Sequence, residues 1–378
     1  RRGLNTPTEK FEPIWVAGFM SGTSIDAVDG ALILSDGERG LDFGPTVERK
    51  YTPQERDVLQ VATRAALDWN WRGPQPDAAF EAAKEVVVST HAAAWEALRT
   101  EASGYDIALV GVHGQTVLHR PPTDMTHGAT LQLMDAPTLQ AKLGLPLAYD
   151  FRSADVAAGG QGAPLAPVYH RALLERESAA AGAVLNLGGV ANVTACLADG
   201  EMLAFDTGPA NGPIDEWVEG HDAGTHDEGG RLAARGRVHD GLLAQLLEHP
   251  WFQTPPPKSL DRYDFNASMA RGLSLEDGAA TLTAFSAHAV ALGLSQLPEM
   301  PERLIACGGG RHNPTLMRML SEAVPCQVFS AEQVGWRGDS IEAEAFAFLA
   351  ARTWRGLPIS WPKTTGAPSP ITGGRLQT

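Results

Sequence analysis

The sequence of 378 residues has few cysteines, few basic residues and no long apolar stretch. Its three cysteines, Cys196, Cys307 and Cys326, form no C-x-x-C pair, so neither a disulfide framework nor a structural zinc site is indicated. No uncharged apolar run reaches the roughly 18 residues that a membrane span needs. The first residues, RRGLNTPTEKFEP, lack the apolar segment of a signal peptide. We therefore expect a cytoplasmic protein.

Basic residues are outnumbered by acidic ones, with 30 lysines and arginines against 45 aspartates and glutamates and a formal net charge of -15. Such a chain repels phosphate backbones and anionic lipid except where basic residues gather locally. Nucleic acid and membranes are therefore not expected partners. At roughly 150 residues per domain, the length predicts two domains with hydrophobic cores of their own.

Apolar runs alternate with helical patterns along the chain. Residues 14–20 are an unbroken apolar run typical of a buried strand, and residues 28–34 form the returning arm of a hairpin. A similar hairpin opens the second half, with strands at 183–187 and 193–197. This alternation predicts an α/β fold, and the two hairpins indicate a duplicated one. The other predicted elements are a helix at 75–99, a strand at 107–112, a helix at 277–297, a strand at 303–307 and a helix at 341–354.

A glycine turn opens each half, although neither a Walker A loop nor a G-x-G-x-x-G fingerprint occurs. In Met20–Asp29 (MSGTSIDAVD), the turn offers backbone N–H groups and hydroxyls that could bind a phosphate. Asn186–Thr194 (NLGGVANVT) repeats this arrangement, and an ordinary hairpin turn explains either motif equally well alone. Facing each other, the turns would clamp a polyphosphate, with Asp26 or Asp206 holding Mg²⁺.

Two segments of the second half carry further candidates. In Phe205–Asp215 (FDTGPANGPID), Asp206 ends a strand and two Gly-Pro pairs fix turns. In Cys307–Asn313 (CGGGRHN), a strand runs into three glycines, on which an adenine ring could lie against the backbone. A plain turn between strand and helix explains these glycines equally well.

Two segments of the first half are rich in polar groups. Tyr149–Pro167 (YDFRSADVAAGGQGAPLAP) places Asp155 near an arginine and a glycine loop, where it is either a general base or a solvated loop carboxylate. Val110–His119 (VGVHGQTVLH) ends a strand with His113 and Gln115, and open α/β sheets bind ligands at such ends. A buried histidine that bonds only to the backbone is the alternative.

Seven motifs of the chain resemble those of the anhydro-N-acetylmuramic acid kinase family and occur in its order, over about residues 14–355. They are MSGTSIDAVD, HGQTVLHRP, YDFRSADVAAGGQGAPLAP, NLGGVANVT, FDTGPANGPID, PPPKSLDRYDF and CGGGRHN. The resemblance implies the bilobal actin/hexokinase-like (ribonuclease H-like) α/β fold, with two lobes around a central ATP cleft. We expect an N-terminal lobe at residues 1–178 plus 341–360 and a C-terminal lobe at 179–340. A tail rich in Pro, Gly, Thr and Ser, residues 361–378, is expected to be flexible.

The implied reaction joins two chemistries in cell-wall recycling. Water opens the 1,6-anhydro ring while ATP phosphorylates O6, giving N-acetylmuramic acid 6-phosphate and ADP. Attack by water needs a carboxylate base, as in an inverting glycosidase, and phosphoryl transfer needs Mg²⁺. The resemblance also implies a homodimer. The alternatives are a nucleotide-independent sugar hydrolase and a non-catalytic nucleotide-binding sensor of the same superfamily.

The resemblance assigns roles to single residues. It makes Asp155 the base that activates water. The implied ATP contacts are Gly22, Thr23, Ser24, Ile25, Asp26, Ala27, Val28, Asp29, Asn186, Gly188, Gly189, Asn192, Asp206, Gly308, Gly309 and Gly310. The implied sugar contacts are His113, Gln115, Thr116 and Glu342, of which Glu342 is equally well explained as an exposed helix-end glutamate. Mg²⁺ is expected at Asp26 and Asp206, directly or through water. Ala27 and Ala210 stand where the family usually has glycine.

Overall fold

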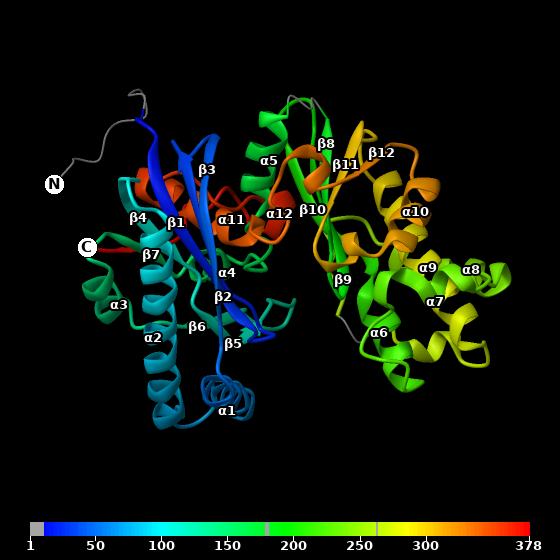
Figure 1. Cartoon of the computed structure of the whole chain (residues 1–378), viewed down its shortest axis with the longest axis horizontal. Helices are drawn as coiled ribbons and strands as arrows, with labels where there is room; N and C mark the ends of the chain where they lie inside the picture. The colour runs from blue at the N-terminus through cyan, green and yellow to red at the C-terminus, as the bar shows by residue number, and fades with distance from the viewer. Residues whose placement is uncertain (1–10, 178–180, 262–263) are drawn as a thin grey trace. The chain divides into compact units, whose positions relative to one another are not determined.

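The structure, a computed structural model, describes residues 11–177, 181–261 and 264–378. The chain divides into two compact units. Unit 1 combines Arg1–Arg176 with Ser340–Thr378, and unit 2 is Glu177–Asp339. Each unit is built on a β-sheet of its own, as the two predicted hairpins indicated (Figure 1).

The sheet of unit 1 has the strand order β13-β7-β4-β1-β2-β3. The first three strands along the chain are antiparallel neighbours, β4 runs parallel to β1, and β7 runs parallel to β4. The strands are β1 (Ile14–Ser21), β2 (Ala27–Ser35), β3 (Gly40–Lys50), β4 (Ile107–Val112), β7 (Leu147–Tyr149) and β13 (Arg375–Gln377). A separate hairpin consists of β5 (Gln115–Arg120) and β6 (Ala129–Leu133).

Alternation along β1 directs its side chains to helices on both faces of this sheet. Ala17 and Phe19 join the buried core formed with α1 and α2. On the other face, Gly18 lets α11 approach so closely that a Cβ there would lie 2.0 Å from the carbonyl oxygen of Ala343. Helix α11, from near the end of the chain, therefore lies directly on strand β1 from near its start (Figure 1). The helices of unit 1 are α1 (Pro53–Trp69), α2 (Asp77–Glu101), α3 (Ala136–Leu143), α4 (Ser153–Ala157), α5 (Pro167–Arg176), α11 (Ile341–Arg355) and α12 (Pro362–Thr365).

The sheet of unit 2 repeats this topology in the order β10-β9-β8-β11-β12. Three antiparallel strands come first and two parallel strands follow, as in β3-β2-β1-β4-β7 of unit 1. The strands are β8 (Gly182–Leu187), β9 (Val190–Cys196), β10 (Met202–Pro209), β11 (Arg303–Cys307) and β12 (Gln327–Ser330). The helices are α6 (Asn211–Gly220), α7 (Arg231–Arg235), α8 (Asp240–Leu247), α9 (Leu275–Ser295) and α10 (Pro314–Ala323). Short 3-10 turns are η1 (Glu228–Gly230), η2 (Pro250–Gln253), η3 (Ala267–Ala270), η4 (Gly309–His312) and η5 (Glu332–Val334).

Helix α9 is the one helix in the described part of the chain that is long and apolar enough to cross a membrane. Most of it is buried inside unit 2, where Ala287, Val290 and Leu294 pack against strands β8 and β9. It is therefore the core helix of this unit, and its hydropathy reflects that burial.

The end of the chain differs from the expectation of a flexible tail at 361–378. Helix α12 forms there, β13 pairs antiparallel with β7, and Thr365 is buried. Its hydroxyl donates a hydrogen bond to Oδ1 of Asp155 at 2.6 Å. Composition alone suggested disorder because the partners of these small polar residues lie far away in the sequence.

Candidate functional site

The turn between β1 and β2 carries the first glycine motif and is held by a buried glutamine. The carbonyl oxygen of Gly22 accepts hydrogen bonds from the amide of Ile25 at 3.1 Å and from Nε2 of Gln115 at 3.3 Å. Oε1 of Gln115 accepts from Oγ of Ser21 at 2.7 Å. Ile25 has a φ of 54°, which a β-branched residue rarely adopts. Gln115 therefore shapes this turn, and it uses the amide that was expected to contact the sugar.

Residues that follow β3 hold the other end of the turn. The amide of Tyr51 donates to the carbonyl oxygen of Asp26 at 3.1 Å, and its hydroxyl lies 2.6 Å from Oγ of Ser21. From α1, Arg56 donates to the carbonyl oxygen of Ser24 at 3.3 Å and lies 3.6 Å from Oδ1 of Asp26. The turn is therefore fixed before any ligand arrives.

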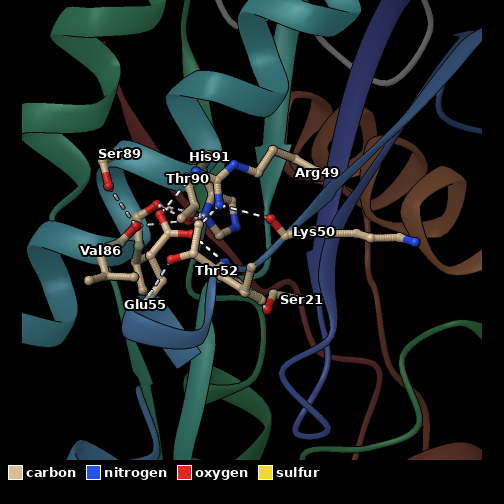
Figure 2. A network of polar contacts seen from close by, with 11 residues as sticks. Ser21, Arg49, Lys50, Thr52, Glu55, Val86, Ser89, Thr90 and His91 are labelled. Atoms are coloured by element: carbon tan, nitrogen blue, oxygen red, sulfur yellow. Dashed lines mark hydrogen bonds and ion pairs between the residues drawn. The ribbon is translucent and has the colours of Figure 1, made fainter. Parts of the chain in front are cut away.

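Figure 2 shows a network of polar contacts around Thr52 and Glu55, which fix the start of α1. Thr52 and Glu55 form a capping box, in which Oγ1 of Thr52 accepts from the Glu55 amide at 3.2 Å and Glu55 accepts from the Thr52 amide at 2.9 Å. Glu55 also forms an ion pair with Arg49. On α2, His91 lies 2.7 Å from the carbonyl oxygen of Val87, and burial lowers the pKa of His91 to about 4. The capping box and the ion pair therefore tie the start of α1 to the end of β3.

The turn residues divide into exposed and buried ones. The side chains of Thr23, Ser24 and Asp26 are exposed and can meet a ligand. Ile25 and Val28 belong to the hydrophobic core, so only their backbone could contact a nucleotide. The half-buried positions are Gly22, Ala27 and Asp29.

Asp155, the base predicted from the sequence, is fully buried. Its Oδ1 accepts from the hydroxyls of Ser360 and Thr365, each at 2.6 Å, and its Oδ2 accepts from the amide of Gly162 at 2.7 Å. The carboxylate therefore joins the glycine loop to the C-terminal segment. A side chain without solvent contact and with both oxygens engaged is poorly placed to take a proton from water.

His113 and Arg152 form a bonded pair in unit 1. Nε of Arg152 donates to Nε2 of His113 at 2.9 Å, and Nη1 donates to the carbonyl oxygen of Gly162 at 2.8 Å. Nδ1 of His113 lies 2.8 Å from the carbonyl oxygen of Gly114, so this nitrogen carries the proton. Burial, reinforced by the charge of Arg152, lowers the pKa of His113 well below its usual value. His113 is thus neutral, and both of its nitrogens are occupied.

Two other predicted sugar contacts lie in the same unit. Glu342 begins α11 and is reached by solvent. Loss of hydration raises its pKa, while the charge of Arg152 acts in the opposite direction. Thr116 is half-buried, and its Oγ1 accepts from Nε2 of Gln132 at 3.2 Å. Unit 1 therefore gathers the first glycine turn, the His113 segment, the Arg152 segment and α11.

In unit 2 the turn between β8 and β9 carries the second glycine motif and caps α6. The carbonyl oxygen of Gly188 accepts from the amide of Asn211 at 2.9 Å. That of Gly189 accepts from the amides of Ala210 at 2.9 Å and Gly212 at 3.1 Å. The second and third motifs of the sequence are therefore one structural feature.

The fourth motif lies against the same turn. A Cβ on Gly308, whose φ is 78°, would lie 2.5 Å from Oδ1 of Asn186, and one on Gly310 would lie 2.6 Å from Cβ of Leu187. At Gly309 a Cβ would meet nothing within 4 Å. Asn192 pairs directly with Asn186 across β9 and β8. This end of the sheet therefore offers open glycine backbone at Gly309 and two amide side chains, those of Asn186 and Asn192.

Asp206 lies in β10 in a setting unlike that of Asp155. It is half-buried, and its Oδ2 accepts from the amide of Leu260 at 2.7 Å. Burial raises the pKa of Asp206 to about 6. Within the described ranges, its Oδ1 accepts no hydrogen bond. Its amide donates to the carbonyl oxygen of Lys258 at 2.9 Å, and burial lowers the pKa of this lysine to about 8.

The sequence analysis assigned no role to Lys258 and noted Arg152 only as a neighbour of Asp155. Both residues lie in motifs that resemble the family's, PPPKSLDRYDF and YDFRSADVAAGGQGAPLAP. Their place in these motifs is the feature of the sequence that could have marked them as candidate site residues. Nζ of Lys258 donates to the carbonyl oxygens of Trp251 at 3.2 Å and Phe252 at 3.3 Å.

Carboxylates that could hold a metal are sparse. In the ranges described, no group of three His, Cys, Asp or Glu side chains could hold a metal ion. Mg²⁺ bound chiefly through nucleotide phosphates needs only one or two carboxylates. The exposed carboxylate of Asp26 is of this kind, and Asp206 has one oxygen without a protein donor.

The duplicated sheet, with glycine turns after its first strands, defines an α/β protein of the actin/hexokinase-like class. The sequence profile of the anhydro-N-acetylmuramic acid kinase family matches residues 14–377, and the chain belongs to this family. It is 53% identical over 364 residues to the anhydro-N-acetylmuramic acid kinase of Caulobacter vibrioides, covering 96% of this chain and 98% of that one. It is 52% identical over 372 residues to that of Rhizobium rhizogenes, covering 97% and 99%.

Similar solved structures include component A of (R)-2-hydroxyglutaryl-CoA dehydratase from Acidaminococcus fermentans, with a TM-score of 0.46 and 12% identity over 90% of this chain and 99% of that one. Membership of the family confirms the kinase activity on anhydro-N-acetylmuramic acid expected from the motifs. It also confirms ATP as the phosphate donor and the part in cell-wall recycling.

Proposed function

We propose that Asp206 is the base that activates water in the opening of the 1,6-anhydro ring. The observation that carries this assignment is its raised pKa of about 6 together with a carboxylate that, among the described residues, is held at Oδ2 only. A base with such a pKa is ionised at neutral pH and still accepts a proton readily. Asp155, the base predicted from the sequence, has both oxygens engaged and no contact with solvent.

The proposed reaction follows from this placement. The bond from Leu260 fixes Oδ2 of Asp206, so Oδ1 is left to take a proton from water. The resulting hydroxide attacks C1 of the sugar, the C1–O6 bond breaks, and its electron pair moves to O6. O6 then takes the γ-phosphoryl group, and ADP leaves. The proton on the aspartate returns to solvent after release of the products.

The glycine turns supply the nucleotide contacts in this proposal. Gly22, Thr23 and Ser24 offer backbone amides and hydroxyls, and the open backbone at Gly309 suits the adenosine. Asp26 is the carboxylate that would hold Mg²⁺, directly or through water, because Asp206 is assigned the role of base. When bound, Mg²⁺ would neutralise phosphate charge.

We also propose a cytoplasmic homodimer. The three cysteines, Cys196, Cys307 and Cys326, form no C-x-x-C pair, which suits a reducing compartment. The dimer rests on the family resemblance, and light scattering on the purified protein tests it. A mass of one chain, 40.1 kDa, would contradict it.

Paired aspartate variants test the base. Asp206→Asn should lower kcat by about 10²- to 10⁴-fold, because it removes the proton acceptor. Asp155→Asn should lower the Tm, because its NH₂ group would face the donors of the C-terminal segment or of Gly162. Asp199→Asn, at an exposed turn of unit 2, is the surface control. A loss of kcat in Asp155→Asn at unchanged Tm, with Asp206→Asn fully active, would reverse the assignment.

Isotope labelling tests the reaction itself. In ¹⁸O-water the label should appear at C1 of N-acetylmuramic acid 6-phosphate, because water and not phosphate supplies that oxygen. Label in inorganic phosphate would mean plain ATP hydrolysis. Sugar opening without ATP would mean the nucleotide-independent hydrolase that the sequence left as an alternative.

A further inference from the structure

Arg152 carries a positive charge that no carboxylate contacts directly. Its two hydrogen bonds go to neutral acceptors, Nε2 of His113 and the carbonyl oxygen of Gly162. Across residues 11–177, 181–261 and 264–378, its Nη2 makes no hydrogen bond and no Asp or Glu oxygen lies within 4.0 Å of its guanidinium. Arginine in such a setting usually forms a forked pair with a carboxylate or a phosphate. A partly buried guanidinium with one free edge therefore points to an anionic ligand.

The surroundings hold this free edge in place. Nε and Nη1 are both bonded, and the ring of Phe346 lies 6.0 Å from Cζ of Arg152 and 4.9 Å from the ring of His113. His113 is itself fixed by its bond to Gly114. Loss of hydration lowers the pKa of Arg152 to about 10, so the group remains charged at neutral pH. Nη2 is therefore a preorganised donor.

The nearby carboxylates favour a ligand with a single negative charge. Glu342 lies on α11 one turn before Phe346 and attracts Arg152 without contacting it. Asp155 also attracts Arg152, although its oxygens bond elsewhere. These two negative charges repel the several charges of a triphosphate more than the one charge of a carboxylate.

We propose that Arg152 binds the carboxylate of the sugar substrate and sets the preference for a muramic acid over the corresponding neutral sugar. This inference rests on the proposed function. A muramic acid differs from its glucosamine counterpart by a lactyl ether at C3 that ends in a carboxylate. That carboxylate matches the free donor edge of the guanidinium, and His113 and Glu342, expected sugar contacts, stand beside it.

Binding of two sugars by paired variants tests the proposal. Dissociation constants are measured for 1,6-anhydro-N-acetylmuramic acid and for 1,6-anhydro-N-acetylglucosamine, together with that of ATP. Arg152→Gln should weaken binding of the muramic acid by about 10- to 100-fold, as loss of a charged hydrogen bond does. Binding of the neutral sugar and of ATP should change by less than about threefold. Arg152→Lys should fall between, since it keeps the charge but not the fork.

The controls separate the possible outcomes. Arg39→Gln removes an exposed arginine that pairs only locally with Asp36, and it should leave both sugars unaffected. Equal weakening of both sugars in Arg152→Gln would overturn the proposal, as would weakening of ATP alone, which would indicate a phosphate contact. If Arg152→Gln does not fold, Arg152→Lys provides the test. The ratio of the dissociation constants of the two sugars is then compared between Arg152→Lys and the wild type. A wild-type enzyme that converts neither sugar would instead overturn the proposed function.

Discussion

Two aspartates show how surroundings decide what a carboxylate can do. Asp155 accepts three hydrogen bonds and serves as a junction between two segments. Asp206 accepts one from Leu260, and burial raises its pKa to about 6. The resemblance to the family favoured Asp155, whose motif is also dense in polar residues and glycines. Donors from Ser360 and Thr365, about 200 residues away, could not be foreseen.

The pH dependence of the rate follows from Asp206. Its carboxylate must be ionised to accept a proton, so kcat/KM should fall tenfold per pH unit below about pH 6. We expect this limb in rates measured between pH 4.5 and 8 on protein checked for folding by circular dichroism. Asp206→Asn should lack the limb. A wild-type limb near pH 4, typical of an unperturbed carboxyl group, would contradict the role of Asp206.

Gln115 is a second residue whose bonding partners could not be predicted from the sequence. Its place after a buried strand suggested a ligand contact, and its motif matched the family. In the structure its amide joins Ser21 to Gly22, which are 94 and 93 residues away in the chain. Local spacing therefore located the neighbourhood of the site but not the partner of each side chain.

At the scale of elements, local periodicity predicted the hairpins and the long helices well. Helices α2, α9 and α11 and strands β1, β4, β8 and β11 lie close to their predicted bounds. The sequence did not show β3, whose residues GLDFGPTVERK mix glycine, proline and charge without alternation. It also did not show β13, whose pairing with β7 joins residues more than two hundred positions apart. Elements defined by a distant partner leave no local pattern.

Because α11 lies so close to the sheet of unit 1, adding one methyl group at Gly18 should strongly lower the free energy of unfolding. Gly18→Ala would place a Cβ 2.0 Å from the carbonyl oxygen of Ala343, so α11 must shift. We expect a loss of about 2–3 kcal/mol in the free energy of unfolding, as for an overpacked core. Chemical denaturation measures it. Gly220→Ala, where a Cβ meets nothing within 4 Å, is the control, and equal stability of the two variants would contradict this packing.

At the scale of the whole molecule, unit 1 keeps several histidines buried and neutral. Burial lowers the pKa of His91 and of His170 to about 4. In the unfolded chain each ring takes up a proton near pH 6.5, whereas in the folded protein it does so only near pH 4. The contribution of these two neutral histidines to the free energy of unfolding is therefore complete above pH 6.5. It is lost as the pH falls toward 4.

Urea unfolding at pH 7 and pH 5 should show this linkage. Each of the two histidines should lower the free energy of unfolding by about 2 kcal/mol at pH 5 relative to pH 7, since one pKa unit corresponds to about 1.4 kcal/mol. In the variant His91→Leu, the free energy of unfolding should fall by about 2 kcal/mol less between pH 7 and pH 5 than in the wild type, because one of the two histidines is gone. A wild-type stability that does not change between the two pH values would contradict the buried neutral state of these rings.

The hydrogen bonds from Ser360 and Thr365 to Asp155 have a consequence for truncation of the chain. These donors follow the carboxylate that they bind by about 200 residues. A chain cut before Ser360 would leave the glycine loop that ends at Gly162 without this anchor, so the neighbourhood of Arg152 would be incomplete. Removing this segment would therefore disturb a site that lies far from it in the sequence.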